Sequence, residues 1–263
     1  MKNLLEFWDS LVRPWGFKKI ILFLDYDGTL TPIVQNPSQA FLSQENKELI
    51  ERLVGNSLYQ VVIISGRRLR DLKAMVGIEG PVYVGNHGWE IEGSSMNFKS
   101  LVSLQASSMM EKVKYELITQ LSEIQGAFVE DKGVTLSVHY RMVMPEKEFL
   151  VKRIFEHISQ PYRRNNEIKV MSGRKVFELK PPVEWDKGKA ALWLLRKQEV
   201  LKGQGNVLAV YIGDVEADQD AFDALENKGI TVMVGLPSSR AQYYLEGPGN
   251  VTEFLRLITE TTP

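Results

Sequence analysis

Short apolar runs recur toward both ends of the chain and predict buried β-strands. They are rich in valine and isoleucine, and turn-forming or helix-starting residues follow them. The runs are 20–24, 61–64, 82–84, 207–212 and 231–234. Because continuous apolar runs are typical of strands covered on both faces, they indicate strands inside a layered molecule.

Segments with apolar residues at helical spacing lie between most of these runs. Residues 42–54 carry Leu42, Leu49, Ile50 and Leu53 on one predicted helical face. Further helices are predicted at 187–198 and 217–226. Strands that alternate with helices favour an α/β fold with a Rossmann-like, doubly wound parallel sheet.

The middle of the chain breaks this alternation. It predicts helix, strand pair, helix and strand pair, at 101–124, 127–130, 134–140, 146–158, 168–171 and 175–180. We therefore expect a catalytic core formed by residues 1–93 and 183–263, with an α+β cap domain, residues 94–182, inserted into it.

Composition narrows the class of protein. Of the 263 residues 44% are hydrophobic and 25% charged, which is ordinary for a globular protein. Lysine plus arginine (32) nearly balances aspartate plus glutamate (33), so we expect no nucleic-acid or membrane partner. The absence of cysteine excludes disulfides and thiol nucleophiles. No segment approaches the roughly 20 apolar residues of a membrane span, and we expect a soluble, cytoplasmic protein.

Polar residues that carry chemistry follow the predicted core strands. In open α/β sheets ligands bind at the carboxyl ends of the strands. The first strand is followed by Asp25-Tyr26-Asp27-Gly28-Thr29, the second by Ser65 and the fourth by Asp214 and Asp218. One of the two aspartates after the first strand can attack phosphorus while the other handles a proton.

A carboxylate that attacks a phosphate ester needs a cation to offset the repulsion between them. Asp25 and Asp214 can supply oxygen ligands to Mg²⁺, with a main-chain carbonyl, phosphate and water completing the shell. The hydroxyl groups of Thr29 and Ser65 can hold phosphate oxygens, and Gly28 lets the backbone approach them.

The sequence Asp25 to Leu30 resembles the first signature of the haloacid dehalogenase superfamily, and Ser65, Lys187 and Gly213-Asp214 with Asp218 resemble the other three in the same order. The resemblance implies that Asp25 is the nucleophile and a metal ligand. It implies that Asp27 is the general acid and base and gives its main-chain carbonyl to Mg²⁺. Ser65 would then bind the phosphoryl group, and Lys187 would neutralise both that group and Asp25. Asp214 would ligate Mg²⁺, and Asp218 would complete the acidic end.

Structural roles compete with some of these functions. An Asp-x-Asp-Gly sequence alone is often just a turn, although three companion motifs at strand ends argue against that here. Ser65 can simply cap the helix that follows it, and Asp218 can be an ordinary acidic residue in the first turn of a helix.

Longer stretches of the chain resemble the trehalose-6-phosphate phosphatase family. They are 25–33, 65–67, 85–90, 130–132, 139–141, 177–181 and 186–189. The resemblance implies a sugar-phosphate substrate surrounded by Arg67, Asn86 and His87 from the core and Glu130, Lys132, Arg141 and Glu178 from the cap. It also suggests a trehalose-phosphate synthase as a protein partner.

The fourth signature departs from the usual pattern of that family, because Val215 and Ala217 replace a carboxylate and a hydroxyl. The expected reaction is hydrolysis of trehalose 6-phosphate with Mg²⁺. The alternatives are another capped phosphatase, acting on sucrose phosphate or mannosylglycerate phosphate, a phosphomannomutase-like phosphotransferase, or a sugar-phosphate-binding module with weak catalysis. An intact set of nucleophile, acid, lysine and metal ligand favours an enzyme.

Overall fold

The computed structural model describes residues 1–12, 19–34, 36–93, 96–99, 104–182, 185–202, 206–214, 218–235 and 240–261. The chain forms two compact units, one of residues 1–99 and 185–263 and one of residues 100–184. We call them the core unit and the insertion unit. The departures at Val215 and Ala217 lie outside the described residues.

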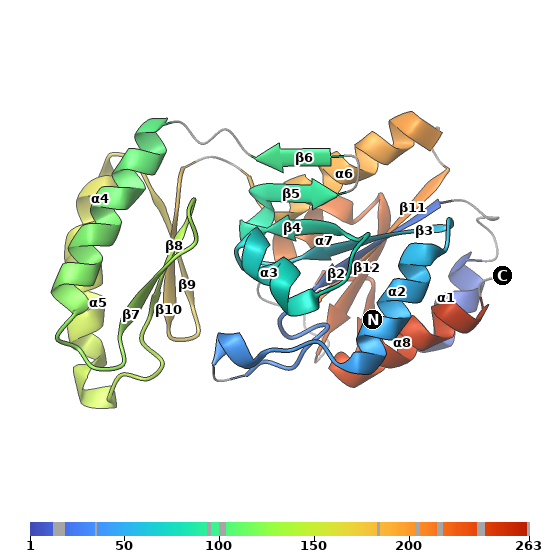
Figure 1. Ribbon diagram of the computed structural model, residues 1–263, viewed down its shortest axis with the longest axis horizontal. Helices are drawn as coiled ribbons and strands as arrows, with labels where there is room; N and C mark the ends of the chain where they lie inside the picture. The colour runs from blue at the N-terminus through green and yellow to red at the C-terminus, as the bar shows by residue number, and fades with distance from the viewer. Residues whose placement is uncertain are drawn as a thin grey trace. The chain divides into compact units, whose positions relative to one another are not determined.

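A mostly parallel sheet forms the centre of the core unit. Within the described ranges it has nine strands in the order β1-β13-β12-β11-β2-β3-β4-β5-β6 (Figure 1). In that order the strands are Lys2–Asn3, Tyr243–Leu245, Gly229–Val234, Val207–Asp214, Lys19–Asp25, Tyr59–Ile64, Val82–Gly85, Glu90–Gly93 and Met96–Lys99. The pairings β4 with β5 and β5 with β6 are antiparallel, and the others are parallel.

Strand β2 lies in the middle of this sheet, with β3 on one side and β11 on the other. The chain runs outward from β2 through β3 to β4 and later returns to place β11 on the opposite flank. The order of strands therefore reverses between β2 and β11, which is where doubly wound sheets bind their ligands. Asp25 and Asp214 are the last residues of these two strands.

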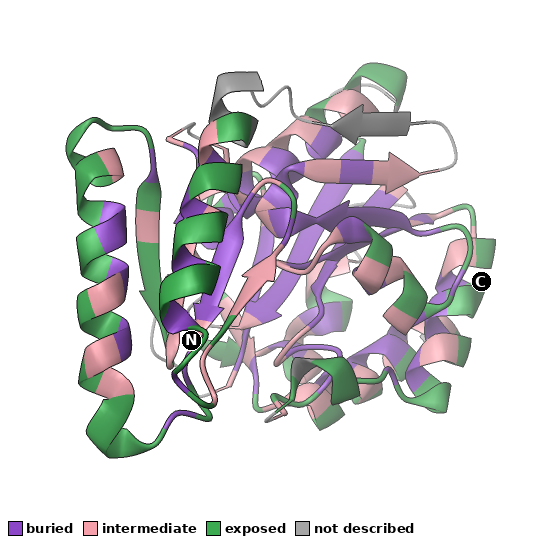
Figure 2. Ribbon diagram, turned by 60° about the vertical axis from the view of Figure 1, so that its left-hand side comes forward, coloured by how far each residue is buried: buried purple, intermediate pink, exposed green. Residues whose placement is uncertain are grey.

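Helices cover both faces of the core sheet, whose strands are largely buried (Figure 2). On one face Ile20, Leu22 and Leu24 pack with α1 (Leu4–Val12), α2 (Gln44–Gly55), α3 (Leu69–Val76) and α8 (Pro248–Thr261). On the other face Ile21 and Phe23 pack with α6 (Lys187–Lys202) and α7 (Gln219–Leu225). Burial of aliphatic side chains on both faces explains the continuous apolar runs of the sequence.

The insertion unit is a two-layer α+β structure. Its antiparallel sheet has the order β7-β8-β10-β9, formed by Phe128–Asp131, Leu136–His139, Val176–Lys180 and Lys169–Gly173. Helices α4 (Leu104–Leu121) and α5 (Glu148–Arg164) share one hydrophobic core with the sheet (Figure 1). Leu136, Val138 and Leu179 face that core, as the alternation of the sequence predicts.

The predicted α/β fold and its doubly wound sheet are confirmed, and the predicted strands and helices are present with shifts of a few residues at their ends. The structure adds β1, β5, β6, β13, α1, α3 and α8 to the core unit. Strand β6 pairs with β5, so residues 96–99 continue the core sheet where the sequence places the start of the cap. No helix within the described ranges is both long and apolar enough to cross a membrane.

Candidate active site

A buried ion pair lies at the carboxyl end of β2. The Asp25 side chain is 4% exposed, and its Oδ1 accepts a hydrogen bond of 2.6 Å from Nζ of Lys187, which is 3% exposed. Lys187 is the first residue of α6, so α6 and β2 together bring these two charges into contact. The pairing satisfies two groups that would each be costly to bury alone.

Asp218 is a second carboxylate on the same ammonium group. Its Oδ1 accepts from Lys187 Nζ at 2.8 Å and from the hydroxyl of Tyr211 at 2.5 Å, and its Oδ2 accepts from the main-chain N–H of Asp214 at 3.1 Å. An added Cβ on Gly213 would lie 2.4 Å from Asp218 Oδ2, so glycine is required for this approach. Asp218 thus ties α6, β11 and the start of α7 together.

This cluster carries more negative than positive charge. Burial raises the pKa of Asp25 well above its ordinary value, the Asp218 carboxylate raises it further, and the Lys187 ammonium lowers it without cancelling the rise. Burial alone would lower the pKa of Lys187, but the carboxylates of Asp218 and Asp25 raise it above its ordinary value. Burial is thus the main cause of the raised pKa of Asp25, whereas the two neighbouring carboxylates are the cause of the raised pKa of Lys187.

The third carboxylate belongs to Asp214, at the end of β11. Its charge also raises the pKa of Asp25, which indicates that the two side chains act on one another. Gly28 has a φ of +87°, and an added Cβ there would lie 3.0 Å from Asp214 Oδ2. The turn after β2 and the Asp214 carboxylate therefore approach one another at a point that a larger residue would obstruct.

Main-chain hydrogen bonds join the segments that follow β3 and β4. The main-chain N–H groups of Asn86 and His87 donate to the carbonyls of Arg67 and Ser65, at 2.6 and 3.1 Å. Asn86 and His87 have φ values of 53° and 56°, a region that non-glycine residues rarely occupy. Ser65 is buried, and its hydroxyl accepts from the N–H of Arg67 at 3.1 Å, so it caps the loop that leads to α3.

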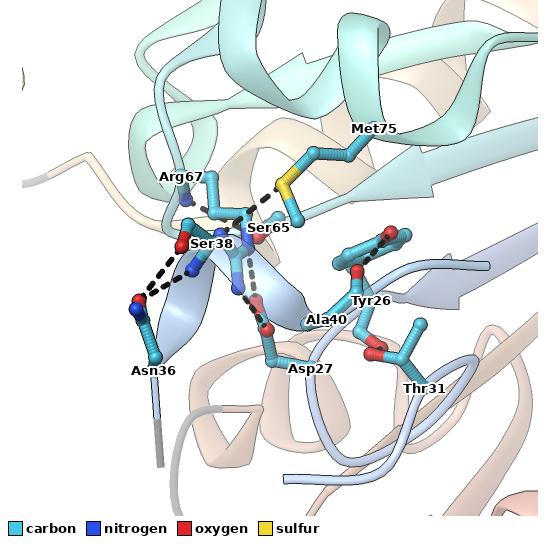
Figure 3. A network of polar contacts seen from close by, with 9 residues as sticks. All are labelled: Tyr26, Asp27, Thr31, Asn36, Ser38, Ala40, Ser65, Arg67 and Met75. Carbon is cyan, nitrogen blue, oxygen red and sulfur yellow. Dashed lines mark hydrogen bonds and ion pairs between the residues drawn. The ribbon is translucent and has the colours of Figure 1, made fainter. Parts of the chain in front are cut away.

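Asp27 pairs with Arg67 rather than with the lysine. Arg67 Nε and Nη2 donate to the two Asp27 oxygens at 2.7 and 2.5 Å, which makes the contact bidentate (Figure 3). The neighbouring Thr29 side chain is fully buried, and its hydroxyl has no hydrogen-bond partner within the described part of the chain. Asp25 and Asp27 thus enter two different ion pairs although they are two residues apart.

The insertion unit has its own polar cluster on one face of its sheet. Lys132 Nζ and the Ser137 hydroxyl donate to Glu178 Oε1 at 3.0 and 3.2 Å, and a ring nitrogen of His139 lies 2.8 Å from Glu130 Oε2. The ring of His139 stacks on Phe128 with centroids 4.5 Å apart. We call Glu130, Lys132, Ser137, His139 and Glu178 the cap polar face. Arg141 is exposed beyond the end of β8 and donates to the carbonyl of Arg174 at 3.4 Å.

Within each unit the structure brings most of the predicted site residues together. Asp25, Lys187, Asp214 and Asp218 form one cluster, and Asp27, Ser65, Arg67, Asn86 and His87 line the adjoining loops. Tyr211 is not among the predicted site residues, although one hydroxyl within an otherwise apolar strand is a signal for a buried partner. Ser137 and His139 are also absent from the predicted site residues, although both join the cap polar face.

Comparisons with known proteins identify a matching family model and relatives of similar sequence. A family model described as trehalose-phosphatase matches residues 23–247. Trehalose 6-phosphate phosphatase RA3 of Zea mays is 37% identical over 256 residues, which cover 91% of this chain and 69% of that protein. Trehalose-phosphate phosphatase B of Arabidopsis thaliana is 34% identical over 269 residues, covering 97% of this chain and 70% of that protein.

Solved structures share the fold. The C-terminal domain of Candida albicans trehalose-6-phosphate phosphatase has a TM-score of 0.79 at 26% identity, covering 97% of this chain and 98% of that chain. A haloacid dehalogenase-like hydrolase from B. subtilis has a TM-score of 0.58 at 15% identity, covering 90% and 98%, which shows the fold alone. The family model spans both units of the structure. The chain belongs to the trehalose-phosphatase family.

Proposed function

We propose that this protein hydrolyses trehalose 6-phosphate to trehalose and phosphate, with Asp25 as the nucleophile. The observation that carries the proposal is the Asp25 carboxylate at the end of β2, held 2.6 Å from the buried Lys187 ammonium in a chain of the trehalose-phosphatase family. Relatives at 34–37% identity are named for this activity. A carboxylate beside a fixed cation can attack phosphorus with less charge repulsion than a carboxylate in water.

The reaction would proceed in two steps. A bond forms between an Asp25 oxygen and phosphorus while the bond from phosphorus to the sugar oxygen breaks, and the proton of Asp27 passes to that oxygen. In the second step the oxygen of a water molecule bonds to phosphorus while the bond from phosphorus to Asp25 breaks, and Asp27 takes the proton of that water. Phosphate would leave, Asp25 would again be a carboxylate and Asp27 would again carry its proton. Lys187 stays near the reacting oxygen in both steps, since Asp218 holds it from the other side.

The residues present fit a magnesium ion. Candidate ligands are the carboxylates of Asp25 and Asp214 and the main-chain carbonyl of Asp27, which are the hard oxygen donors that Mg²⁺ prefers. Asp25 and Asp218 share one ammonium group, and the pKa of Asp25 is raised first by burial and then by the carboxylates of Asp218 and Asp214, whose charge a bound cation would offset. Within the described ranges, no group of three or more acidic, histidine or cysteine side chains is arranged to hold a metal ion. Phosphate and water would therefore complete the coordination shell of Mg²⁺. When bound, the ion would neutralise charge on the phosphoryl group.

The cap polar face is the candidate sugar-recognition surface. Its carboxylates and ammonium group can donate and accept hydrogen bonds with sugar hydroxyls. Glu130, His139 and Glu178 are partly exposed, whereas Lys132 and Ser137 are buried. We propose that the insertion unit selects the leaving group in this way and that Arg141, Asn86 and His87 also contribute to substrate binding. The phosphoryl chemistry and the choice of sugar would then reside in separate units.

A trehalose-phosphate synthase remains a candidate partner. The C-terminal domain of a Candida albicans trehalose synthase regulatory protein has a TM-score of 0.70 at 15% identity, which shows only that the fold is shared. A pull-down with purified synthase would test the partnership, and retention of the synthase on the phosphatase is the expected result.

Phosphate release from a panel of sugar phosphates tests the function. We expect a preference for trehalose 6-phosphate over sucrose, mannosylglycerate and mannose phosphates, loss of activity in EDTA, and recovery with Mg²⁺ but not with Ca²⁺, which favours longer bonds and more ligands. Equal rates on all substrates would refute the choice of sugar. Full activity in EDTA would refute the metal site, and no phosphate release from any ester would refute the phosphatase itself.

A further inference from the structure

Arg67 makes a two-point contact with the residue proposed to transfer protons. Its Nε and Nη2 donate to the Oδ2 and Oδ1 atoms of Asp27 at 2.7 and 2.5 Å (Figure 3). A fork-to-carboxylate contact fixes the plane of the carboxylate as well as its distance, which a single hydrogen bond does not do. A carboxylate has about four lone-pair sites, so a fork that uses one on each oxygen leaves others open.

Other contacts hold the arginine in place. Its main-chain N–H donates to the Ser65 hydroxyl and its carbonyl accepts from the N–H of Asn86, at 3.1 and 2.6 Å. Its Nη1 lies 3.2 Å from the sulfur of Met75 on α3, and its guanidinium carbon lies 5.6 Å from the centre of the Tyr26 ring. Arg67 is thus anchored through its backbone and along its side chain.

The two partners differ in their exposure to water. The Arg67 side chain is 15% exposed, whereas that of Asp27 is 40% exposed. An ordinary surface ion pair has two mobile, hydrated side chains and contributes little to stability. Here the cation is the inner, packed partner, and the carboxylate is the outer one that water or a ligand can reach. This asymmetry is what a support for a working carboxylate requires.

We propose that Arg67 is a positioning residue that orients Asp27 for proton transfer, an inference that rests on the proposed function. The family resemblance places Arg67 around the substrate, whereas these contacts assign its guanidinium to Asp27. When the bond from phosphorus to the ester oxygen breaks, its electron pair goes to that oxygen, which receives the proton from an Asp27 oxygen. Removing the fork leaves Asp27 present but free to rotate, and a misplacement of about 1 Å can lower a rate on the order of 10²-fold.

Leaving groups of different basicity test this role. The steady-state kcat/KM reports the step that breaks the ester bond, and p-nitrophenolate leaves without a proton whereas phenolate and sugar alkoxides need one. For Arg67→Ala we expect kcat/KM to fall roughly 10- to 100-fold on phenyl phosphate and trehalose 6-phosphate. The fall on p-nitrophenyl phosphate should stay within about threefold, and this retained activity also reports that the variant is folded.

Comparison with Asp27→Asn separates positioning from substrate binding. If Arg67 acts through Asp27, adding Arg67→Ala to Asp27→Asn should change kcat/KM by no more than about twofold, because the group it orients is already disabled. An equal loss with and without the Asp27 carboxyl group, or an equal loss on all three esters, would show direct contact with the substrate and overturn the proposal.

Two further variants serve as controls. Arg67→Lys keeps the charge but loses the fork, and we expect it to recover only a small part of the loss; full recovery would overturn the two-point role. Arg70→Ala removes an exposed arginine three residues away, whose partner is Asp71, and should match the wild type on every ester. Because two aryl phosphates carry the comparison, a wild type that rejects trehalose 6-phosphate would refute the proposed substrate and leave this test intact.

Discussion

The charged cluster at the end of β2 and the cap polar face use similar ion pairs in opposite surroundings. Lys187, Asp25 and Asp218 are 3%, 4% and 0% exposed, whereas Lys132 is 9%, Glu178 21% and Glu130 37% exposed. In the core unit, buried charges are fixed in position by contacts from several elements. In the insertion unit, partly hydrated charges can exchange a partner within the protein for a hydroxyl group of a ligand. We infer that buried, fixed charges suit phosphoryl transfer, which is the same for every sugar phosphate. Partly exposed charges suit recognition of the sugar, which differs between substrates.

The largest effect should follow from Asp25→Asn. An amide is a poor nucleophile, so we expect kcat to fall by a factor on the order of 10⁴ or more. The unfolding temperature in EDTA should stay equal to that of the wild type or rise, because asparagine removes an ionisable group whose pKa burial and Asp218 raise. Phosphate release and thermal unfolding measure the two effects. A kcat within tenfold of the wild type would mean that the buried cluster does not carry out phosphoryl transfer, and the comparison of the two regions would fail.

Removing the lysine should destabilise the protein more in the buried cluster than in the cap polar face, and Lys187→Met tests the first of these. It leaves Asp25 and Asp218 buried without their cation, and we expect the free energy of unfolding in EDTA to fall by about 3 kcal/mol. The matched change in the insertion unit, Lys132→Met, removes a partner of the more exposed Glu178 and should cost about 1 kcal/mol. Urea denaturation measures both. Equal losses would mean that burial does not distinguish the two clusters.

Glu178→Ala should sharpen the comparison on the side of recognition. Loss of a hydrogen bond from a charged group predicts a roughly 10- to 100-fold fall in kcat/KM for trehalose 6-phosphate. The small ester p-nitrophenyl phosphate lacks the sugar and should lose much less. Glu156→Ala, on an exposed position of α5 that pairs with Arg163, is the control and should change neither. Equal losses on both esters would assign Glu178 to the stability or closure of the insertion unit.

The smallest effect should come from Tyr211→Phe. It removes one donor to Asp218 but leaves those from Lys187 and the Asp214 N–H, so we expect kcat to fall roughly three- to tenfold with KM unchanged, about 1 kcal/mol. Tyr83→Phe is the matched control, since the Tyr83 hydroxyl is also buried but donates to the carbonyl of Ile78. A similar fall in kcat for both variants would show a general effect of losing a buried phenol.

The sequence predicts the parts of the fold whose signals are local. Strands β2 and β11 are aliphatic runs buried on both faces, and the alternation around Val138 identifies the buried face of β8. Strand β5 has only four residues, of which Ile91 alone is buried, so its signal is too short to identify. The prediction omits α8, although its apolar residues have helical spacing, because no later strand or site motif marks it as part of the alternation.

The candidate site shows the same limit. Motif order places Asp25, Ser65 and Asp214 at strand ends, because parallel strands bring their carboxyl ends to one edge, and it places Lys187 at the start of a helix. The family resemblance pairs Lys187 with Asp25, but no local pattern pairs a cation with Asp27. Asp27 and Arg67 are far apart in sequence, and their pairing depends on how the loops after β2 and β3 pack. The position of a site residue is therefore predictable from the sequence pattern, whereas the ion pair between Asp27 and Arg67 is known only from the tertiary structure.

The central place of β2 also has a consequence for biosynthesis. Strand β2 pairs with β3 soon after synthesis, but its other edge waits for β11, with Lys19 opposite Val207. The whole insertion unit is translated in between. Until then a long apolar strand keeps one edge unpaired, which is a site for wrong association, and the non-local pairing slows folding. We expect the nascent chain to depend on chaperones during this interval and to acquire activity only after β11 and α7 have left the ribosome.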